Sequence, residues 1–241
     1  MKNQLLFLTL LLLPILARGY DACINDIYYN LDNSTMEASV TYSYQRYSPT
    51  YSYKGSIKIP EIVLNNGKEY RVTSIGETAF WTCTGLTSLT LPKSIKKIDM
   101  QAFDGCINLT AVHISDLAAW CQINFGLDEG NNPLWFAHHL YLDDKEIIDL
   151  CIPDNITYVN SYAFSGGSSI TSVSIPNSVT GIGTSAFSGC SSMTSISIPN
   201  NITVIESEAF QDCSSLTTVT IPNSVTIIGF GAFNGYINRD L

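Results

Sequence analysis

Charged residues are scarce in this sequence of 241 residues: lysine, arginine, aspartate and glutamate together make up only 14%. Twelve basic residues against 21 acidic ones leave a net charge of −9. Nucleic acids and anionic membrane surfaces both require a basic patch opposite their phosphates, so the composition argues against either partner. Serine, threonine, asparagine and tyrosine must therefore supply much of the polar surface.

Long apolar runs are also missing, except at the N-terminus. There Lys2 precedes a run of Leu, Phe and Ile that is too short to span a membrane convincingly, and small residues at 17 and 19 suit a cleavage site. We therefore predict a signal peptide over residues 1–19 and a secreted or cell-surface location, with no later membrane-spanning segment. Acylation of Cys23 is disfavoured because an aspartate lies in the stretch before it.

Signatures of catalysis are sparse as well. The stretch GIGTSA at residues 181–186 matches a dinucleotide-binding fingerprint, but no strand–helix–strand unit surrounds it and similar stretches recur at the same phase elsewhere. Cys151 and His113, both predicted to point outward, are the remaining nucleophile–base candidates. Neither a third orienting group nor an oxyanion hole accompanies them.

Only three histidines are present, and two of them are adjacent. His138 and His139 could ligate a metal together with Asp143, Asp144 and Glu146. Adjacent residues of a strand point to opposite faces, which argues against one shared site. We expect no metal, no cofactor and no enzymatic activity.

Repetition is what the chain has in abundance. The pair Ala-Phe recurs, mostly 23 residues apart, and ends at Phe80, Phe103, Phe164, Phe187, Phe210 and Phe233. Around it the chain follows the template Val/Ile-x-x-Ile-x-x-x-x-Ala-Phe-x-x-Cys-x-x-Leu-x-x-Leu-x-Ile-Pro. A fixed period of this length with Leu-x-x-Leu-x-Leu spacing is typical of a leucine-rich repeat solenoid. We predict a mainly β, right-handed superhelix of 23-residue coils, in which the phenylalanine rings stack as a structural ladder.

The cysteines divide into two groups. Four of the seven share one repeat column, where small buried residues form a second ladder: Cys83, Cys106, Cys190 and Cys213. Gly167 fills this column in one coil. We expect free thiols there, because side chains in register on parallel strands point the same way and pair badly. A disulfide among Cys23, Cys121 and Cys151 is left open.

The repeat, as in IPNSVTGIGTSAFSGCSSMTSISIPN, closely resembles the units of the BspA-like leucine-rich repeat family of bacterial surface proteins. The resemblance covers about Val72 to Gly235. It implies adhesion or other protein–protein contact at a cell surface rather than catalysis, and it does not identify a receptor.

Two segments depart from the period. Residues 20–71 are predicted to form an N-terminal β cap with an Asp-Asn turn and an Asn66-Gly67 hairpin, and the solenoid occupies residues 72–241. Residues 116–152 are an irregular insert, in which DLAAWCQI has helical spacing and HLYLDDKEIIDLCIP suggests two strands around an acidic turn. The insert is either part of a binding surface or a tolerated variant of one coil.

The cap also carries a tyrosine cluster: Tyr42, Tyr44, Tyr47, Tyr51 and Tyr53. These rings serve either cap packing or protein binding. At the other end, the last coil stops short of its strand, and the sequence leaves open whether the final residues fold back as a cap or the chain is a shortened family member. The oligomeric state is left open too.

Without a catalytic constellation, the outward side chains of the repeat strands are the candidate binding residues. They are Ser88, Thr90, His113, Ser172, Ser174, Ser195, Ser197, Thr218 and Thr220. This flat array suits a broad partner: host extracellular-matrix proteins, other cell-surface proteins, or glycans. The first hypothesis is therefore an exported adhesion or binding protein. The alternatives are a non-adhesive structural or periplasmic scaffold and, more remotely, a thiol- or metal-dependent hydrolase.

Overall fold

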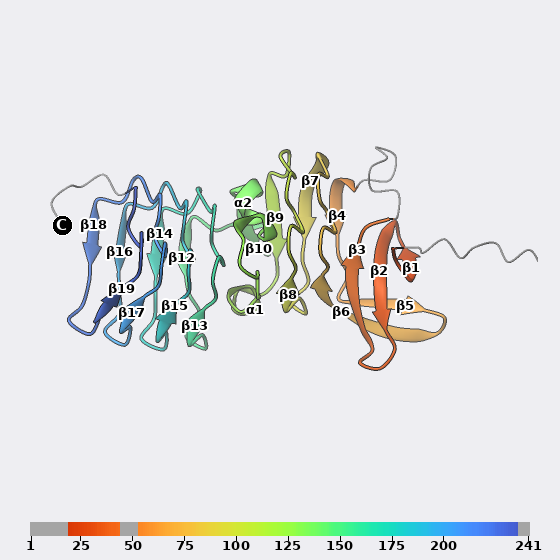
Figure 1. Ribbon diagram of the computed structural model, residues 1–241, viewed down its shortest axis with the longest axis horizontal. Coiled ribbons are helices and arrows are strands. Elements are labelled where there is room, and N and C mark those ends of the chain that lie inside the picture. Colours follow the sequence, from red (N-terminus) through yellow and green to blue (C-terminus); the bar gives the residue numbers. More distant parts are fainter. Residues whose placement is uncertain (1–18, 44–52, 236–241) are drawn as a thin grey trace, which may run out of the picture.

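The computed structural model describes residues 19–43 and 53–235, which form an elongated solenoid in Figure 1. Coils follow one another along the long axis, from the N-terminal strands at one end to the last coil at the other. The prediction of a mainly β solenoid is confirmed. Residues 1–18 of the predicted signal peptide 1–19 lie outside the described residues, as do Tyr44, Tyr47 and Tyr51 of the tyrosine cluster and the final residues 236–241.

The N-terminal sheet is built from a three-stranded antiparallel meander and an antiparallel hairpin, which pair with each other in parallel. Its strands are β1 (Ala22–Ile24), β2 (Ile27–Asp32), β3 (Glu37–Thr41), β5 (Ile62–Asn65), β6 (Lys68–Ile75) and β8 (Lys97–Ile98). Their order is β1-β2-β3-β6-β5, with β8 also paired to β6. The predicted Asn66-Gly67 turn joins β5 to β6, with φ of 50° and 76°. Positive φ at both positions gives the type I′ turn whose twist suits a hairpin.

A second sheet runs from the cap into the repeats. Its strands, in spatial order, are β11 (Lys145–Glu146), β10 (Leu140–Leu142), β9 (Ala111–Ile114), β7 (Gly85–Thr90) and β4 (Lys54–Lys58). Neighbours are parallel except β10 and β11, which form the hairpin around an acidic turn that the sequence predicted. Because β4 pairs with β7, the parallel sheet begins before the first regular repeat.

The later coils place their strands in two further parallel sheets. One contains β12 (Asp149–Cys151), β14 (Ser172–Ser174), β16 (Ser195–Ser197) and β18 (Thr218–Thr220). The other contains β13 (Tyr158–Val159), β15 (Gly181–Ile182), β17 (Val204–Ile205) and β19 (Ile227–Ile228). Ser195 lies between Ser172 and Thr218, so strands pair one period apart and in register.

The phenylalanine rings form two stacks. Ring centroids are 5.0 Å apart between Phe80 and Phe103, and 5.4, 5.5 and 5.3 Å apart along the series Phe164, Phe187, Phe210 and Phe233. Tyr53 extends the first stack, with its ring 4.5 Å from that of Phe80. The file is interrupted between Phe103 and Phe164, where the irregular coil intervenes. The repeat template predicts a ring in every coil, but this coil has none at that corner.

The cysteine column also makes hydrogen bonds. The thiols of Cys106, Cys190 and Cys213 each donate to the carbonyl oxygen of the phenylalanine one coil earlier, at 3.1, 3.4 and 3.3 Å. All seven cysteines of the chain are unpaired in the structure. A thiol is small enough for the column, and its S–H adds a second hydrogen bond to a carbonyl that already accepts a backbone amide within its own turn.

The irregular coil contains α1 (Leu117–Cys121), the 3₁₀ turn η1 (Glu129–Asn131) and α2 (Leu134–Ala137). The predicted helix is thus present as α1, with Trp120 and Cys121 buried and the Asp116 side chain accepting from the Ala119 amide. Phe103 donates its amide to the Gly130 carbonyl, whereas Phe80 donates to that of Ala102. Gly130 therefore takes the alanine position, and Asn131 stands where the next phenylalanine is expected.

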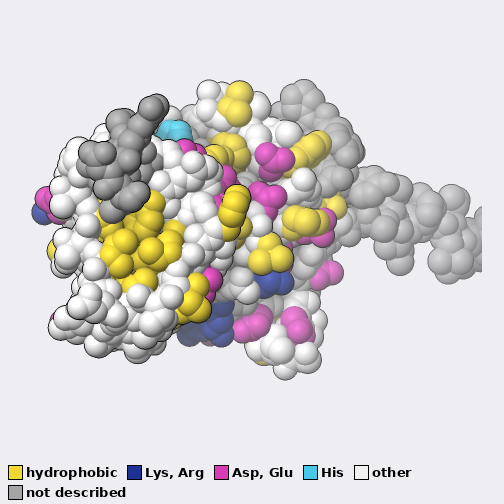
Figure 2. All heavy atoms as spheres, turned by 60° about the vertical axis from the view of Figure 1, so that its left-hand side comes forward, with side chains coloured by type: hydrophobic (Ala, Val, Ile, Leu, Met, Phe, Trp, Pro, Cys, Tyr) yellow, Lys and Arg dark blue, Asp and Glu magenta, His cyan; other side chains and the backbone are white. Residues whose placement is uncertain are grey.

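At the far end, the last coil leaves apolar side chains exposed. Ile227, Ile228 and Phe230 are 57%, 52% and 86% exposed. Figure 2 shows hydrophobic side chains gathered at this end of the solenoid. No described coil stacks upon it.

Candidate functional site

The outward side chains of β12, β14, β16 and β18 form two rows across the coils. One row contains Ser172, Ser195 and Thr218, and the other contains Ser174, Ser197 and Thr220. Between the rows the side chains of Val173 and Ile196 are buried. The two rows arise because strand side chains alternate between faces and each coil repeats the same alternation.

A groove follows the ends of these strands. It has a volume of about 600 Å³ and is lined by Ser174, Ser197 and Thr220 together with the asparagines and prolines of the following turns. The strands stop there because each is followed by proline, which has no amide to donate to a ladder. No charged side chain lines the groove. Its chemistry is therefore hydroxyl, amide and backbone.

The three predicted binding residues nearer the N-terminus have different surroundings. Ser88, Thr90 and His113 are half-buried on β7 and β9, and Thr90 pairs with His113. The His113 ring stacks on Tyr141 of β10, with centroids 4.8 Å apart, and its Nδ1 lies 3.1 Å from Asp144 Oδ1. This trio adds an aromatic and charged cluster to a face that otherwise carries hydroxyl groups.

Sequence analysis did not include Tyr141 and Asp144 among the candidate binding residues. The alternation in HLYLDD would have placed Tyr141 outward, in register with His113, if β10 had been aligned as the strand following β9. The insertion between them removed the 23-residue spacing that identified the other face residues.

The histidine–carboxylate group of the insert is divided among separate contacts. His139 Nδ1 lies 2.6 Å from Glu146 Oε1, whereas His138 ends α2 in a left-handed conformation and contacts the Gly166 carbonyl at 2.9 Å. The assumption that both histidines lie on one strand is therefore wrong. No group of three or more ligating side chains in the described ranges could hold a metal ion.

Cys151 and His113 share no hydrogen bond among the described residues. Cys151 is exposed on β12, whereas the ring of His113 is held by Tyr141 and Asp144. The buried thiols are poor nucleophiles: burial raises the pKa of Cys83 to about 11 and those of Cys121 and Cys213 to about 12. The arrangement offers no assembled nucleophile–base pair in this part of the chain.

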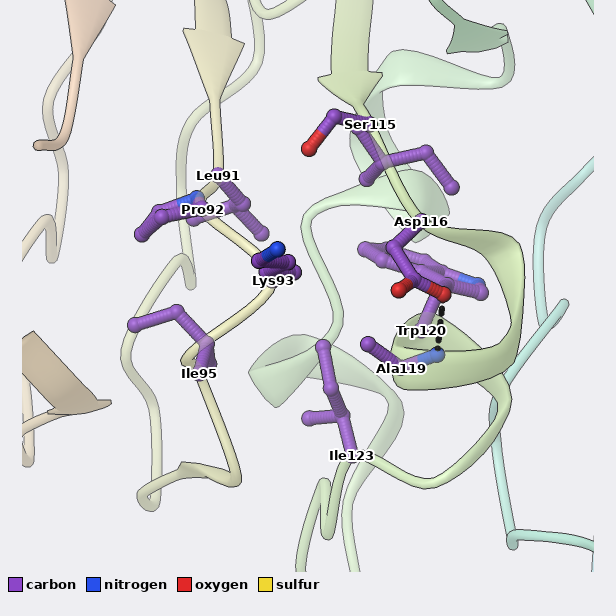
Figure 3. Close-up of a pocket in the computed structure, with 10 residues that line it drawn as sticks. Leu91, Pro92, Lys93, Ile95, Ser115, Asp116, Ala119, Trp120 and Ile123 are labelled. Carbon is purple, nitrogen blue, oxygen red and sulfur yellow. Dashed lines mark hydrogen bonds between the residues drawn. The ribbon is translucent and has the colours of Figure 1, made fainter. Parts of the chain in front are cut away.

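Figure 3 shows another hollow, at the seam between a regular turn and α1. Pro92, Lys93 and Ile95 lie on one side, and Asp116 and Trp120 on the other. Its volume is about 10 Å³, enough for about one water molecule. The hollow is a packing seam.

Across residues 19–43 and 53–235, no helix has the length and apolar character needed to cross a bilayer. Charged residues do lie beside the predicted binding face: Lys58 pairs with Thr90, Asp144 contacts His113, and Asp149 accepts a hydrogen bond from Ser172 at 2.6 Å.

Short parallel strands, a constant coil length and buried apolar columns define the class of the molecule as a leucine-rich repeat protein. Residues 29–123 and 138–239 match the family described as the BspA type leucine rich repeat region, in six copies. This match spans most of the chain, so the protein belongs to that family, as the resemblance implied. No curated protein matches the chain.

Several solved structures are similar. A leucine-rich repeat protein from T. pallidum is 19% identical with a TM-score of 0.47, covering 89% of this chain and 88% of that one. A leucine-rich cell surface protein from Faecalibacterium prausnitzii is 22% identical with a TM-score of 0.41, covering 88% and 73%. The pneumococcal vaccine antigen PcpA is 16% identical with a TM-score of 0.41, covering 89% and 79%.

Proposed function

We propose that the chain is an exported binding protein that contacts other proteins through its strand face and performs no catalysis. The strand face consists of Ser88, Thr90, His113, Ser172, Ser174, Ser195, Ser197, Thr218 and Thr220, together with Tyr141. The observation that carries the proposal is the pair of in-register hydroxyl rows beside an uncharged groove of about 600 Å³. Membership of the BspA-type repeat family is compatible with protein binding.

A broad partner suits this face better than a small one. Sites for small molecules enclose most of the ligand, whereas the two rows extend over successive coils and are exposed except at Ser172, which is half-buried. No charge lines the groove, and Asp144 and Asp149 are held by His113 and Ser172, so affinity comes mainly from contact area and not from long-range steering. The stacked rings of His113 and Tyr141 supply the aromatic anchor that interfaces prefer.

The test is a set of glutamate substitutions on the groove. The triple variant Ser174→Glu, Ser197→Glu, Thr220→Glu is compared with the unmodified chain for binding to immobilised extracellular-matrix proteins and to other bacterial cells. We expect at least about a tenfold loss of affinity, because three charges are desolvated without partners. Equal binding by the variant would show that the partner contacts another surface.

A matched control places the same charges elsewhere on the same coils. Thr157, Thr180 and Thr203 are exposed at the same spacing on the segments that lead into β13, β15 and β17. Their replacement by glutamate is expected to change binding by less than about twofold.

Export to the cell surface is tested separately. Protease added to intact cells is expected to cleave the protein at its exposed turns. A protein that resists protease on intact cells but is cleaved after lysis would instead be a periplasmic scaffold.

A further inference from the structure

A further hollow, separate from the groove and from the seam beside α1, lies at the corner of the coils where the strands of the face begin. Its volume is about 550 Å³, within the range of roughly 300–1,000 Å³ typical of ligand sites. The side chains around it are Ile107, Trp135, Phe136, His138, Ser168 and Ser191. None of them belongs to the strand face, and the sequence singled out only His138 among them, as a candidate metal ligand.

The irregular coil supplies the aromatic side of this hollow. Helix α2 buries Leu134 and Ala137 against the coils and leaves Trp135 and Phe136 half-buried at the surface. Gly166, with φ of 81°, makes room for it: a Cβ there would lie 2.4 Å from the Cα of Trp135. The helix therefore rests directly on the coil corner, which fixes the two aromatic residues in place.

The opposite side is polar but uncharged. The Gly166 carbonyl can only accept a hydrogen bond, so His138 donates from Nδ1, and Nε2 of the neutral ring remains an acceptor. The hydroxyl groups of Ser168 and Ser191 make no hydrogen bond within the described chain. No aspartate, glutamate, lysine or arginine lines the hollow.

We propose that this hollow binds a neutral sugar ring of a glycan. A pyranose ring has apolar C–H faces that pack on Trp135 and Phe136, and hydroxyl groups at its rim that reach Ser168, Ser191 and His138. An apolar peptide side chain would desolvate those polar groups without replacing their hydrogen bonds to water, which is unfavourable. A charged ligand would meet no opposite charge.

Titration calorimetry with short neutral oligosaccharides of glucose, galactose, mannose and N-acetylglucosamine tests the proposal on the full chain. At least one of them is expected to bind saturably. Trp135→Ala should then weaken binding at least about tenfold, because the ring face is lost. Phe230→Ala, which removes an aromatic side chain that is 86% exposed at the far end of the solenoid, should leave it unchanged.

A second variant keeps the aromatic residues and removes the hydroxyl groups. Ser168→Val with Ser191→Val is expected to weaken sugar binding about fivefold to tenfold while the thermal unfolding midpoint stays close to that of the unmodified chain. This variant retains α2 and its contacts, so it separates recognition from folding.

Three outcomes would overturn the proposal. One is that none of these sugars binds saturably, and another is that folded Trp135→Ala and the double valine variant bind as well as the unmodified chain. The third is that a hydrophobic peptide competes for the hollow and is unaffected by the valine changes, which would identify a protein side chain as the occupant. The glutamate variant of the strand face should bind the sugar normally, so failure of one proposal leaves the other standing.

Discussion

A thiol in the cysteine column fills a small apolar space and donates a hydrogen bond to the coil before it. Gly167 replaces cysteine in the coil after the insert for a local reason. A Cβ at this position would lie 2.9 Å from Cδ1 of Ile170, and Cδ2 of Leu134 from α2 lies at 3.4 Å. The side chain of Ile170, in the same coil, therefore extends into the space that a thiol would take, whereas Leu134 lies at ordinary van der Waals distance.

Glu129 is a partly buried carboxylic acid whose ionisation opposes folding. Burial raises the pKa of its carboxyl group above its ordinary value of 4.5, and the negative charges of Glu208, Asp128 and Asp212 raise it further. A hydrogen bond from Ser188 opposes the shift. The folded state thus keeps this proton to a higher pH than the unfolded chain does.

We predict that Glu129→Gln stabilises the protein at neutral pH. In the window between the ordinary pKa and the raised one, the folded state binds more protons, so stability falls as pH rises through it. Glutamine has no charge to lose, and its advantage should fade as the pH is lowered toward 4.5. Thermal unfolding midpoints of both proteins, measured across this range, check the effect. Parallel profiles would show that Glu129 is not strained by its neighbours.

On the scale of elements, the irregular coil replaces backbone hydrogen bonds with side-chain amides. Asn131 Oδ1 accepts from the Gln101 amide at 2.6 Å and its Nδ2 donates to the Phe125 carbonyl at 2.7 Å. Asn132 Nδ2 donates to the Tyr162 carbonyl at 2.6 Å while its Oδ1 accepts from the amide of Leu134. These two buried amides connect the insert to the coils on both sides.

Asn132→Leu is expected to destabilise the protein by about 2 to 3 kcal/mol. The substitution conserves side-chain size but leaves the buried Leu134 amide without its partner and removes one of the two hydrogen bonds to the Tyr162 carbonyl, which keeps the Ser165 amide. The control is Asn155→Leu, an exposed position where the change should stay within about 0.5 kcal/mol. Urea unfolding measures both. Equal midpoints for the two variants would refute a linking role for Asn132.

At the scale of the whole molecule, each coil contacts only its neighbours, so stability is a sum of coil and interface contributions. The same residue type therefore contributes differently to the free energy of unfolding at different positions along the solenoid. Phe187 is fully buried between two rings, whereas Phe233 is half-buried and stacks in the described chain only on Phe210. The last described coil, which no described coil follows, likewise leaves apolar side chains exposed.

Phe187→Ala is therefore predicted to cost about 3 to 5 kcal/mol, as for a fully buried aromatic residue. Phe233→Ala is predicted to cost only about 1 to 2 kcal/mol, because less apolar area leaves water when its ring packs. Denaturant unfolding of the two variants gives the loss of stability at two positions of the same phenylalanine stack. A larger loss for Phe233 would mean that the end of the solenoid is as well packed as its interior.

The fold follows from a property that the sequence displays directly. Each regular coil repeats one 23-residue pattern. Its strand, the turn that contains proline and the columns of inward side chains can therefore be predicted from a single copy. The phase of each repeat also decides which side chains point outward, and so Ser195 and Thr218 could be aligned before any coordinates existed.

Only the tertiary structure shows how the side chains are arranged in the insert, where the 23-residue period is interrupted. Asn131 in a ring position, Tyr141 beside His113 and Trp135 over Gly166 all depend on how the insert lies on its neighbours. In the regular repeats each strand pairs in the same register as the one before it, so the contacts between coils can be predicted. The insert lacks this period, so its position is set only by how its side chains pack on the neighbouring coils. The buried amide of Asn131 and the aromatic rings of Tyr141 and Trp135 all lie in the insert.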